Sequence, residues 1–142
     1  YQIISEEKIP AHFICSVSHP LAQKQNIDAK ELLNEPFMLT EKGMSYRRLM
    51  DEQLAKHSLE ITPVLEFSNP SQITQLVEQG QGLSFLPDYV TKPFLEKGTI
   101  CYLDVPEFQI DVWKQIVVHR DKWMSASLKA VLNHLSQIQI YR

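Results

Sequence analysis

The sequence lacks both an excess of basic residues and a long apolar run. Basic residues are not in excess, because 14 Lys and Arg stand against 17 Asp and Glu and leave a net charge of −3. That balance excludes a nucleic-acid-binding surface of the usual basic kind. No apolar run approaches the length of a membrane span, and no signal-peptide pattern opens the chain. We therefore expect a protein without a membrane segment.

Cysteine is also scarce. The chain has two, Cys15 and Cys101, which lie far apart in the sequence and within apolar, strand-like runs. Cysteine in such runs is usually buried and reduced, which is how we interpret both residues. A reactive pair is the alternative.

What the sequence does contain is ordinary for a soluble globular protein. Of its 142 residues, 44% are hydrophobic and 22% are charged, which excludes a disordered class. The length fits one domain, or one lobe together with part of another. Because the chain starts at Tyr1 and not at methionine, we expect it to be a piece of a longer protein.

Two of the four glycines stand close together, in a stretch that runs from Ile73 to Pro87. The order there is a helix, Gly80, a turn through Gly82 and an apolar strand. Dinucleotide-binding loops have the opposite order, a strand, a glycine turn and then a helix whose N-terminus faces the phosphates. We therefore interpret these glycines as a helix cap and a tight turn, with phosphate binding as the alternative.

Strands and helices alternate along most of the chain. Near-continuous apolar runs, alternation and turn residues predict strands at 12–18, 37–40, 61–67, 83–86, 99–103 and 112–119. Capping residues and apolar spacing predict helices at 28–33, 45–57, 70–79, 88–98 and 125–138. The alternation between 37 and 103 indicates crossover units and a largely parallel sheet. The predicted fold is one α/β lobe, bracketed by a strand that enters it and a strand that leaves it.

The helix at 45–57 has a clear apolar face. Its buried stripe should consist of Tyr46, Leu49, Met50 and Leu54. The pairs Arg47–Asp51 and Arg48–Glu52 have the four-residue spacing of exposed ion pairs, so we place both on the solvent side.

Signals of catalysis are weak. None of the five histidines shows a metal-ligand spacing, and most carboxylates lie on helix faces that should be exposed. Gly82-Leu83-Ser84 begins like a nucleophile elbow, but Leu86 stands where the motif requires glycine. We therefore predict no catalytic residue, no metal site and no cofactor, and we interpret the chain as a protein that is not an enzyme.

Two loops have the character of a binding site. Each should follow the carboxyl end of a strand and lead into a helix, which is where open α/β sheets bind ligands. Free amide groups at the helix start, with the Ser45 hydroxyl, would suit a carboxylate or another small anion. The alternative is that Ser45 and Asn69 only cap their helices. The candidate ligand-binding residues are Thr40, Gly43, Met44, Ser45, Phe67, Ser68 and Asn69.

The order of several short motifs resembles the effector-binding domain of LysR-type transcriptional regulators. The motifs are Ser18-His19-Pro20-Leu21-Ala22, Pro36-Phe37, Gly43-x-Ser45-x-Arg47, Val77-x-x-Gly80-x-Gly82-x-x-x-Leu86-Pro87 and Val118-x-Arg120. The resemblance implies a fold like that of type 2 periplasmic binding proteins, which have two lobes. Residues 12–112 would form the second lobe, and residues 113–142 would be the return strand and C-terminal helix of the first lobe.

The same resemblance implies a function. The chain would be the effector-sensing and oligomerisation domain of a bacterial transcription regulator in the cytoplasm. It would bind a small, anionic metabolite in a cleft between the lobes, with the loops at 40–45 and 67–69 facing that cleft. The protein would be a homodimer or homotetramer and would contact DNA only through an N-terminal helix-turn-helix that this chain does not contain. A lobe of a periplasmic solute-binding protein is the first alternative, and an enzyme on the same fold is the second.

Overall fold

The computed structural model describes residues 2–118 and 126–137. The strands are β1 (Gln2–Ser16), β2 (Met38–Leu39), β3 (Leu65–Glu66), β4 (Ser84–Pro87), β5 (Ile100–Tyr102) and β6 (Ile110–Val118). The helices are a 3₁₀ turn η1 (Pro20–Gln23), α1 (Ala29–Leu32), α2 (Ser45–Lys56), α3 (Pro70–Glu78), α4 (Asp88–Lys97) and α5 (Ala126–Gln137). In the described part of the chain, no helix has the length and apolar character needed to cross a membrane.

The strands after β1 share one direction. β2 pairs with β3 in parallel, and a parallel bridge joins Phe37 to Leu83 at the edge of β4. β4 and β5 both pair antiparallel with β1, which lies between them, so they run the same way as each other. The predicted parallel arrangement between 37 and 103 is therefore confirmed. The antiparallel insertion of β1 into its middle was not predicted.

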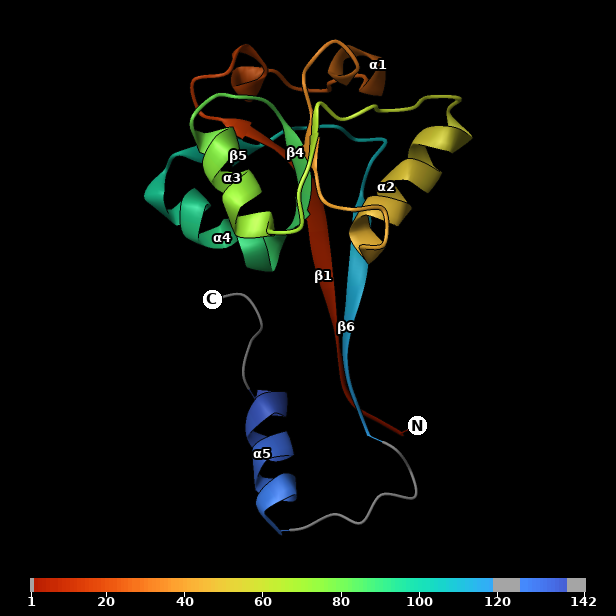
Figure 1. The fold of residues 1–142 in the computed structure, drawn as a ribbon, viewed down its shortest axis with the longest axis vertical. Helices are drawn as coiled ribbons and strands as arrows, with labels where there is room; N and C mark the ends of the chain where they lie inside the picture. The colour runs from red at the N-terminus through yellow and green to blue at the C-terminus, as the bar shows by residue number, and fades with distance from the viewer. Residues whose placement is uncertain (1, 119–125, 138–142) are drawn as a thin grey trace.

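β1 is the longest element and serves two parts of the structure. Its segment from Gln2 to Ala11 pairs with β6, with an irregularity between Ile3 and Ser5, in a two-stranded ribbon that extends away from the helices, as Figure 1 shows. From Ala11 onward it enters the main sheet and pairs with β4. Pro10, which has no amide hydrogen to donate, stands just before this second partner begins. The predicted start of the strand at His12 is wrong, because β1 begins at Gln2.

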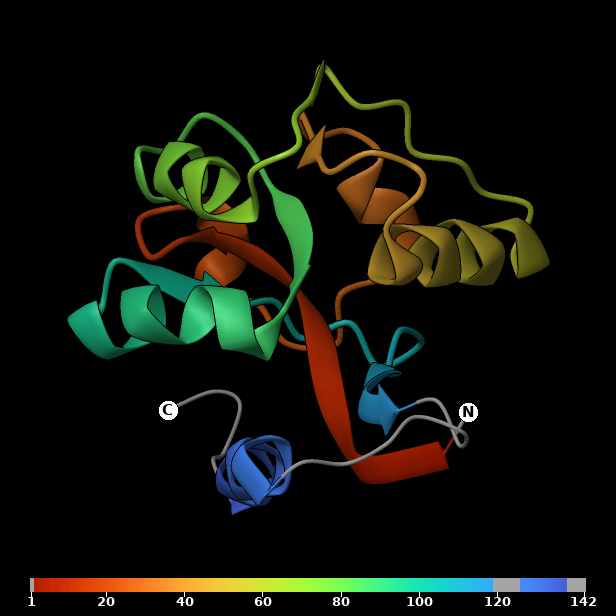
Figure 2. The ribbon, with the colours of Figure 1, turned by 60° about the horizontal axis from the view of Figure 1, so that its bottom comes forward.

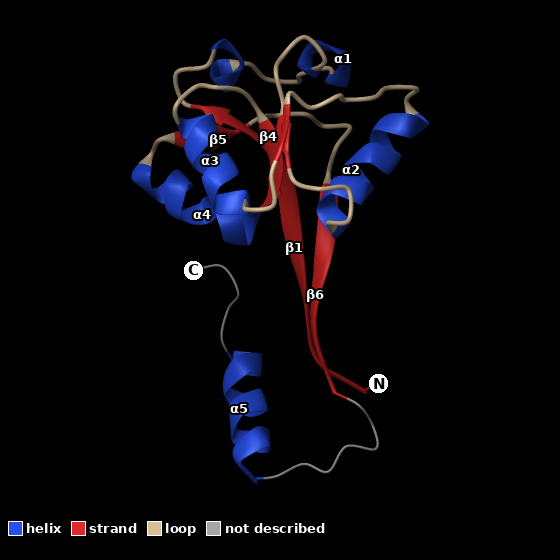
Figure 3. Ribbon diagram, in the orientation of Figure 1, coloured by secondary structure: helices blue, strands red, loops and turns tan. Residues whose placement is uncertain are grey.

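Helices cover both faces of the sheet, as expected for an α/β fold. Figures 1 and 2 show α3 and α4 on one side of β1 and β4, with α2 on the other side. Figure 3 shows α2, α3 and α4 beside the strands, and the colours of Figure 1 show that all three helices begin at the end of the lobe from which β1 and β6 extend. The end of the lobe that carries the helix N-termini therefore faces the ribbon.

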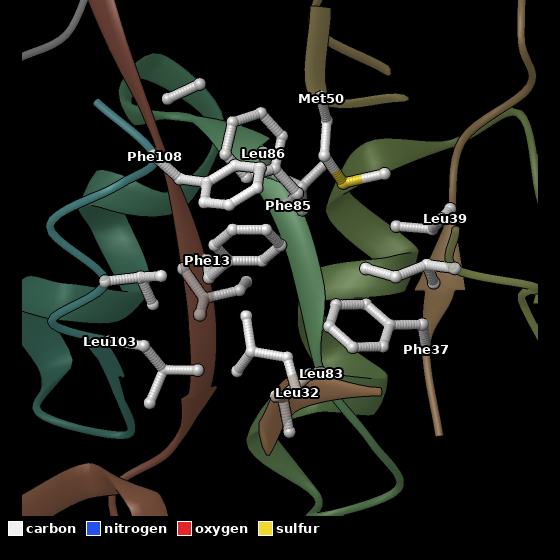
Figure 4. Close-up of a cluster of buried hydrophobic side chains, with 14 of the residues drawn as sticks. Phe13, Leu32, Phe37, Leu39, Met50, Leu83, Phe85, Leu86, Leu103 and Phe108 are labelled. Atoms are coloured by element: carbon white, nitrogen blue, oxygen red, sulfur yellow. The ribbon is translucent and has the colours of Figure 1, made fainter. Parts of the chain in front are cut away.

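The core lies around Phe13 of β1, which is 2% exposed. Its ring centroid is 4.8 Å from that of Phe85, 5.5 Å from that of Phe108 and 5.9 Å from that of Phe37. Figure 4 shows how aliphatic side chains from several elements fill the space around these rings. Aromatic clusters of this kind contribute beyond their buried area, so the entering strand is tied firmly to the lobe.

Most predicted helix bounds are confirmed within one or two residues, and the capping residues explain why. Asp28 accepts a hydrogen bond from the Lys30 amide at the start of α1, and Gly98 ends α4 with a left-handed φ of 76°. The strand predicted at 61–67 is reduced to Leu65–Glu66. Of the two last predicted elements, His119, Ser125 and Ile138 lie outside the described residues.

The two glycines after α3, Gly80 and Gly82, meet different structural requirements. Gly80 has a φ of 79°, which favours glycine, as predicted for a helix cap. Gly82 is needed for space, because a Cβ atom there would lie 2.6 Å from the carbonyl oxygen of Pro36. Both glycines serve the architecture, and both follow a helix.

Candidate functional site

The structure places the two predicted loops next to each other. Leu39 of β2 is paired with Glu66 of β3, and the Phe67 amide donates to the Leu39 carbonyl over 3.0 Å. Thr40 and Phe67 therefore follow these two strands at the same edge of the sheet. The prediction that the two loops lie at the same edge of the sheet is therefore confirmed.

The predicted residues form an exposed surface and not a closed pocket. Thr40 is 1% exposed, and Met44 is half-buried where it packs against the core. The remaining residues are exposed: Gly43, Ser45, Phe67, Ser68 and Asn69. This surface covers the end of the lobe that faces the β1–β6 ribbon.

The N-terminus of α2 is open. Met44 is the N-cap residue and its side chain makes no capping hydrogen bond, while Ser45 is already the first helical residue. The helix's own ladder begins with the Arg48 amide, which donates to the Met44 carbonyl over 3.0 Å. The amides of the first turn have no carbonyl within the helix to bind, so they face outward with the positive end of the helix dipole. The alternative that Ser45 caps α2 is wrong.

The neighbouring helix α3 is capped. The Asn69 side-chain oxygen accepts hydrogen bonds from the amides of Ser71, at 3.0 Å, and Gln72, at 3.2 Å. Asn69 thus fills the capping role that sequence analysis gave as the alternative. Its side-chain oxygen is already engaged and is not available to a ligand in this state.

The third helix that begins at this end, α4, already has an anion at its start. Asp88 lies in its first turn, and its Oδ1 atom is 2.7 Å from Nδ1 of His12. The His12 ring also stacks on Tyr102, with ring centroids 4.0 Å apart. Of the three helix starts, α2 alone therefore has neither a side-chain cap nor an acidic residue in its first turn.

Arg47 connects the two loops to α2. Its side chain is 3% exposed; Nη1 donates to the Thr40 carbonyl over 2.7 Å and to Glu66 over 3.2 Å. Nε donates to Asp51 over 3.0 Å. The ends of β2 and β3 and the first half of α2 thus share one buried guanidinium group.

The burial of Arg47 corrects the sequence analysis, which placed the Arg47–Asp51 pair on the solvent side. The Arg48–Glu52 pair does lie there, with a separation of 3.7 Å and side-chain exposures of 65% and 59%. Arg47 stands next to Tyr46 at the border of the buried stripe, so helical spacing could not decide its side. The motif Gly43-x-Ser45-x-Arg47 was the signal that could have identified it.

Two buried hydroxyl groups lie behind this surface. The hydroxyl oxygens of Thr40 and Tyr46 are both shielded from solvent, and neither meets hydrogen-bonding geometry with any group. Burial raises the pKa of the Tyr46 phenol, and the nearby Thr40 hydroxyl offsets part of that shift. Buried polar atoms without partners are uncommon in folded proteins and mark places where a ligand or a rearrangement can satisfy them.

One cavity of about 450 Å³ shares Arg47 and Glu66 with this network and lies between α2 and the segment 59–63. Lys42 is its one lining residue from the first predicted loop, and Ser45, Ser68 and Asn69 do not line it. The cavity and the exposed loop surface are therefore two distinct places where a small molecule could bind.

The candidates that sequence analysis dismissed stay apart in space. Ser84 lies fully buried in β4, as predicted. His19 lies 3.2 Å from Glu35 and His57 lies 3.1 Å from Glu107, each in its own part of the lobe. Each pair joins two segments of the lobe that are distant in the sequence.

Comparison with known proteins gives a consistent picture. A family model described as "LysR substrate binding domain" matches residues 8–139. YwqM, an HTH-type transcriptional regulator of Bacillus subtilis (strain 168), is 37% identical over 123 residues. That match covers 84% of this chain and 40% of YwqM, so the chain spans about two fifths of the length of this relative.

Solved structures agree on the fold. The regulatory domain of CcmR from Synechocystis PCC6803, in complex with 2-PG, has a TM-score of 0.77 and 26% identity. The match covers 95% of this chain and 64% of that one. The effector-binding domain of QuiR in complex with shikimate has a TM-score of 0.71 and 18% identity, over 93% of this chain and 64% of that one. The predicted fold class, an α/β lobe of the periplasmic-binding-protein type, is confirmed.

Proposed function

Because the chain belongs to the LysR substrate-binding domain family, we propose that it is the effector-sensing part of a transcription regulator. The relatives YwqM and CmpR are HTH-type transcription regulators, which favours this proposal over a solute-binding protein or an enzyme. The regulator would act in the cytoplasm, contact DNA through a helix-turn-helix outside residues 1–142, and carry out no catalysis.

We assign residues 12–112 to the second lobe of the effector-binding domain. The remaining residues, 113–142, would be the return strand and the C-terminal helix of the first lobe. The β1–β6 ribbon supports this division, because it leaves the compact part of the structure at the end that carries the candidate loops. An effector would then bind between this end and the first lobe.

The effector should be a small molecule with a carboxylate or phosphate group. The open N-terminus of α2 carries this proposal, since its outward-facing amides and dipole favour an anion, whereas α3 is capped and α4 has Asp88. Glu41 and Lys42 are both exposed in the same loop and offset each other in charge, so the helix start and not the loop side chains supplies the preference for an anion. The CcmR and QuiR domains hold 2-PG and shikimate, and we extend to this chain the general property of binding a small-molecule effector.

Effector binding would act through linkage. An effector that contacts both lobes binds the closed arrangement better than the open one and shifts the population toward it. The change would reach DNA through the arrangement of subunits. Effector binding and subunit arrangement would be linked by one coupling free energy, so that each equilibrium shifts the other. Arg47 would hold the two loops of this lobe in one geometry during closure.

Self-association has a candidate surface on this lobe. Val64 and Leu65 expose 69% and 40% of their surface at the start of β3, which is the edge of its sheet. Exposed apolar edge strands tend to be covered by another chain. Sedimentation velocity of a Leu65→Lys variant of the regulator tests this surface; an unchanged sedimentation coefficient would remove it from consideration.

The effector site is tested by placing a negative charge at the α2 N-terminus. Ser45→Asp should stabilise the helix, because a carboxylate interacts favourably with the first turn, and should also exclude an effector anion. The regulator is screened against small carboxylates and phosphates, including 2-PG and shikimate, by thermal shift. The variant should melt at the same or a higher temperature than the wild type and lose the shift that the effector causes.

Ala55→Asp is the matched control. It adds the same charge to the last turn of the same helix, where Ala55 lines the 450 Å³ cavity. The effector should still raise the melting temperature of the Ala55→Asp variant. Loss of the shift in Ala55→Asp but not in Ser45→Asp would place the effector in the cavity and overturn the assignment to the α2 N-terminus.

A further inference from the structure

The two cysteines of the sequence lie side by side on neighbouring strands of the sheet. Cys15 of β1 is paired directly with Cys101 of β5, and their Sγ atoms are 3.6 Å apart. Both are free thiols. The sequence separates them by 86 positions, so this contact exists only in the folded lobe.

The Cα atoms of this pair have the spacing that a disulfide needs. The neighbouring hydrogen bonds, Leu103 amide to Phe13 carbonyl and Val17 amide to Thr99 carbonyl, lie two positions before and after Cys15. In an antiparallel ladder, pairs two positions apart are of the same type, so Cys15 and Cys101 form a hydrogen-bonded pair with Cα atoms about 5.5 Å apart. Disulfides join Cα atoms at about 5.5–6 Å, and the sulfurs have to approach to about 2 Å. The Cβ atoms of a hydrogen-bonded pair lie about 5–5.5 Å apart, whereas a disulfide needs about 3.5–4.5 Å, so the two strands have to shift slightly as the side chains rotate.

The two thiols differ in access to reagents. Cys15 is 0% exposed, and burial together with the neighbouring Cys101 raises the pKa of its thiol well above the ordinary value. Cys101 is partly exposed at the edge of the same sheet. A reagent from solvent therefore meets Cys101 first, and Cys15 is positioned to react second.

We propose that Cys15 and Cys101 are an oxidative modification site, at which a small disulfide such as oxidised glutathione converts the dithiol into an intramolecular disulfide. The Cys101 thiolate attacks one sulfur of the small disulfide, so that a mixed disulfide forms and one small thiol leaves. Cys15 then attacks the Cys101 sulfur, which forms the Cys15–Cys101 bond and breaks the bond to the small molecule; the Cys15 proton passes to the departing thiolate, which leaves as the second small thiol. The protein dithiol is oxidised by two electrons, and the small disulfide is reduced to two thiols.

The site is remote from the candidate effector loops. Ala11 of β1 pairs with Pro87 at the carboxyl end of β4, whereas Ile14 pairs with Ser84 at its start. Cys15 follows Ile14, so the pair lies at the opposite end of the sheet from Thr40 and Phe67. The modification would join β1 to β5 without touching the α2 N-terminus, and its test is independent of effector binding.

The experiment incubates the purified protein with oxidised glutathione, quenches with acid and measures intact mass and free thiols. The expected product has lost two hydrogen atoms and both thiols, is monomeric on a non-reducing gel and reverts with dithiothreitol. Digestion should yield one linked peptide pair that contains Cys15 and Cys101. A product that stops at glutathione bound to Cys101, or a folded protein that does not react while its urea-unfolded form does, would overturn the proposal.

Two variants test the order of the steps. Cys15→Ala should accumulate the mixed disulfide on Cys101, because no second thiol is present to release glutathione. Cys101→Ala should leave Cys15 unmodified in the folded state, since Cys15 is buried. Faster reaction at Cys15 than at Cys101 would overturn the assigned order, and the linked peptide of the wild-type protein decides the modification even if a variant fails to fold.

Discussion

The guanidinium group of Arg47 donates a 2.7 Å hydrogen bond to the carbonyl oxygen of Thr40, with both residues almost fully buried. A cation on the first turn of α2 thus holds the first residue of the candidate loop at 40–45. The same guanidinium group also contacts Glu66 and Asp51, whose side chains are 44% and 37% exposed. The geometry of the loop therefore depends on a side chain that does not itself reach the exposed surface.

Replacing Arg47 by methionine should lower the free energy of unfolding by about 1–3 kcal/mol, because the Thr40 carbonyl would be buried without a donor. Urea unfolding followed by circular dichroism measures this loss. Arg48→Met is the control, since its ion pair with Glu52 is exposed and should be worth less than about 1 kcal/mol. Equal losses in the two variants would contradict the role assigned to Arg47.

Gly82→Ala should destabilise the lobe by about 1–3 kcal/mol, because the new methyl group would lie 2.6 Å from the Pro36 carbonyl oxygen. Gly43→Ala should be nearly neutral, since nothing lies within 4 Å of a Cβ atom at that position. Denaturant midpoints of the two variants compare them directly. A Gly82→Ala protein as stable as the wild type would show that the backbone segments at Gly82 and Pro36 can move apart without loss of stability.

Asn69→Ala should cost about 1 kcal/mol, because the Ser71 and Gln72 amides lose their cap. Ser45→Ala should change stability by less than about 0.5 kcal/mol, because Ser45 is not a cap. We expect Ser45→Ala to weaken the effector response nonetheless. A large loss of stability in Ser45→Ala would mean that its hydroxyl has a structural role.

Glu78 should contribute a pH-dependent part of the stability. The Thr99 hydroxyl and then the Lys97 ammonium lower the pKa of its carboxyl below the ordinary value of 4.5. A group whose pKa is lower in the folded state stabilises the protein above its unfolded pKa and loses that contribution as the pH falls through the folded pKa. The stability difference between the wild type and Glu78→Gln should therefore be present at neutral pH and shrink in acid below pH 4.5. Glu96→Gln, which changes an exposed carboxylate of α4, is the control.

Oxidation of Cys15 and Cys101 should raise the stability of the lobe. A cross-link between residues 86 positions apart removes loop entropy from the unfolded chain, worth up to about 4 kcal/mol if the folded state is not strained. Guanidinium unfolding of the oxidised and reduced protein measures the difference. An oxidised protein less stable than the reduced one would show that the bond distorts the sheet.

Local signals predicted the helices well. Asp28, Asn69 with Pro70, and Gly98 each fix a helix end through contacts within a few residues, and such contacts are visible in a sequence. The loop surface was predictable for the same reason, because it follows from where strands end and helices begin.

Features that depend on distant partners were not predictable. The first half of β1 is polar, and its partner strand is about a hundred residues away, so neither periodicity nor turn residues revealed it. Arg47 is buried because Thr40 and Glu66 of other elements meet it there. The contact between Cys15 and Cys101 likewise depends on the register of two strands.

The position of β1 also determines when the lobe can fold. Its residues pair with β4, β5 and β6, so its partners begin at Ser84 and end at Val118. On the ribosome, β1 would wait without these partners until most of the lobe has been synthesised. Contacts between such distant segments slow folding, and an unpaired apolar strand is prone to aggregation while it waits. Expression of this lobe should therefore benefit from a chaperone that covers the segment around Phe13 until β4 and β5 have been made.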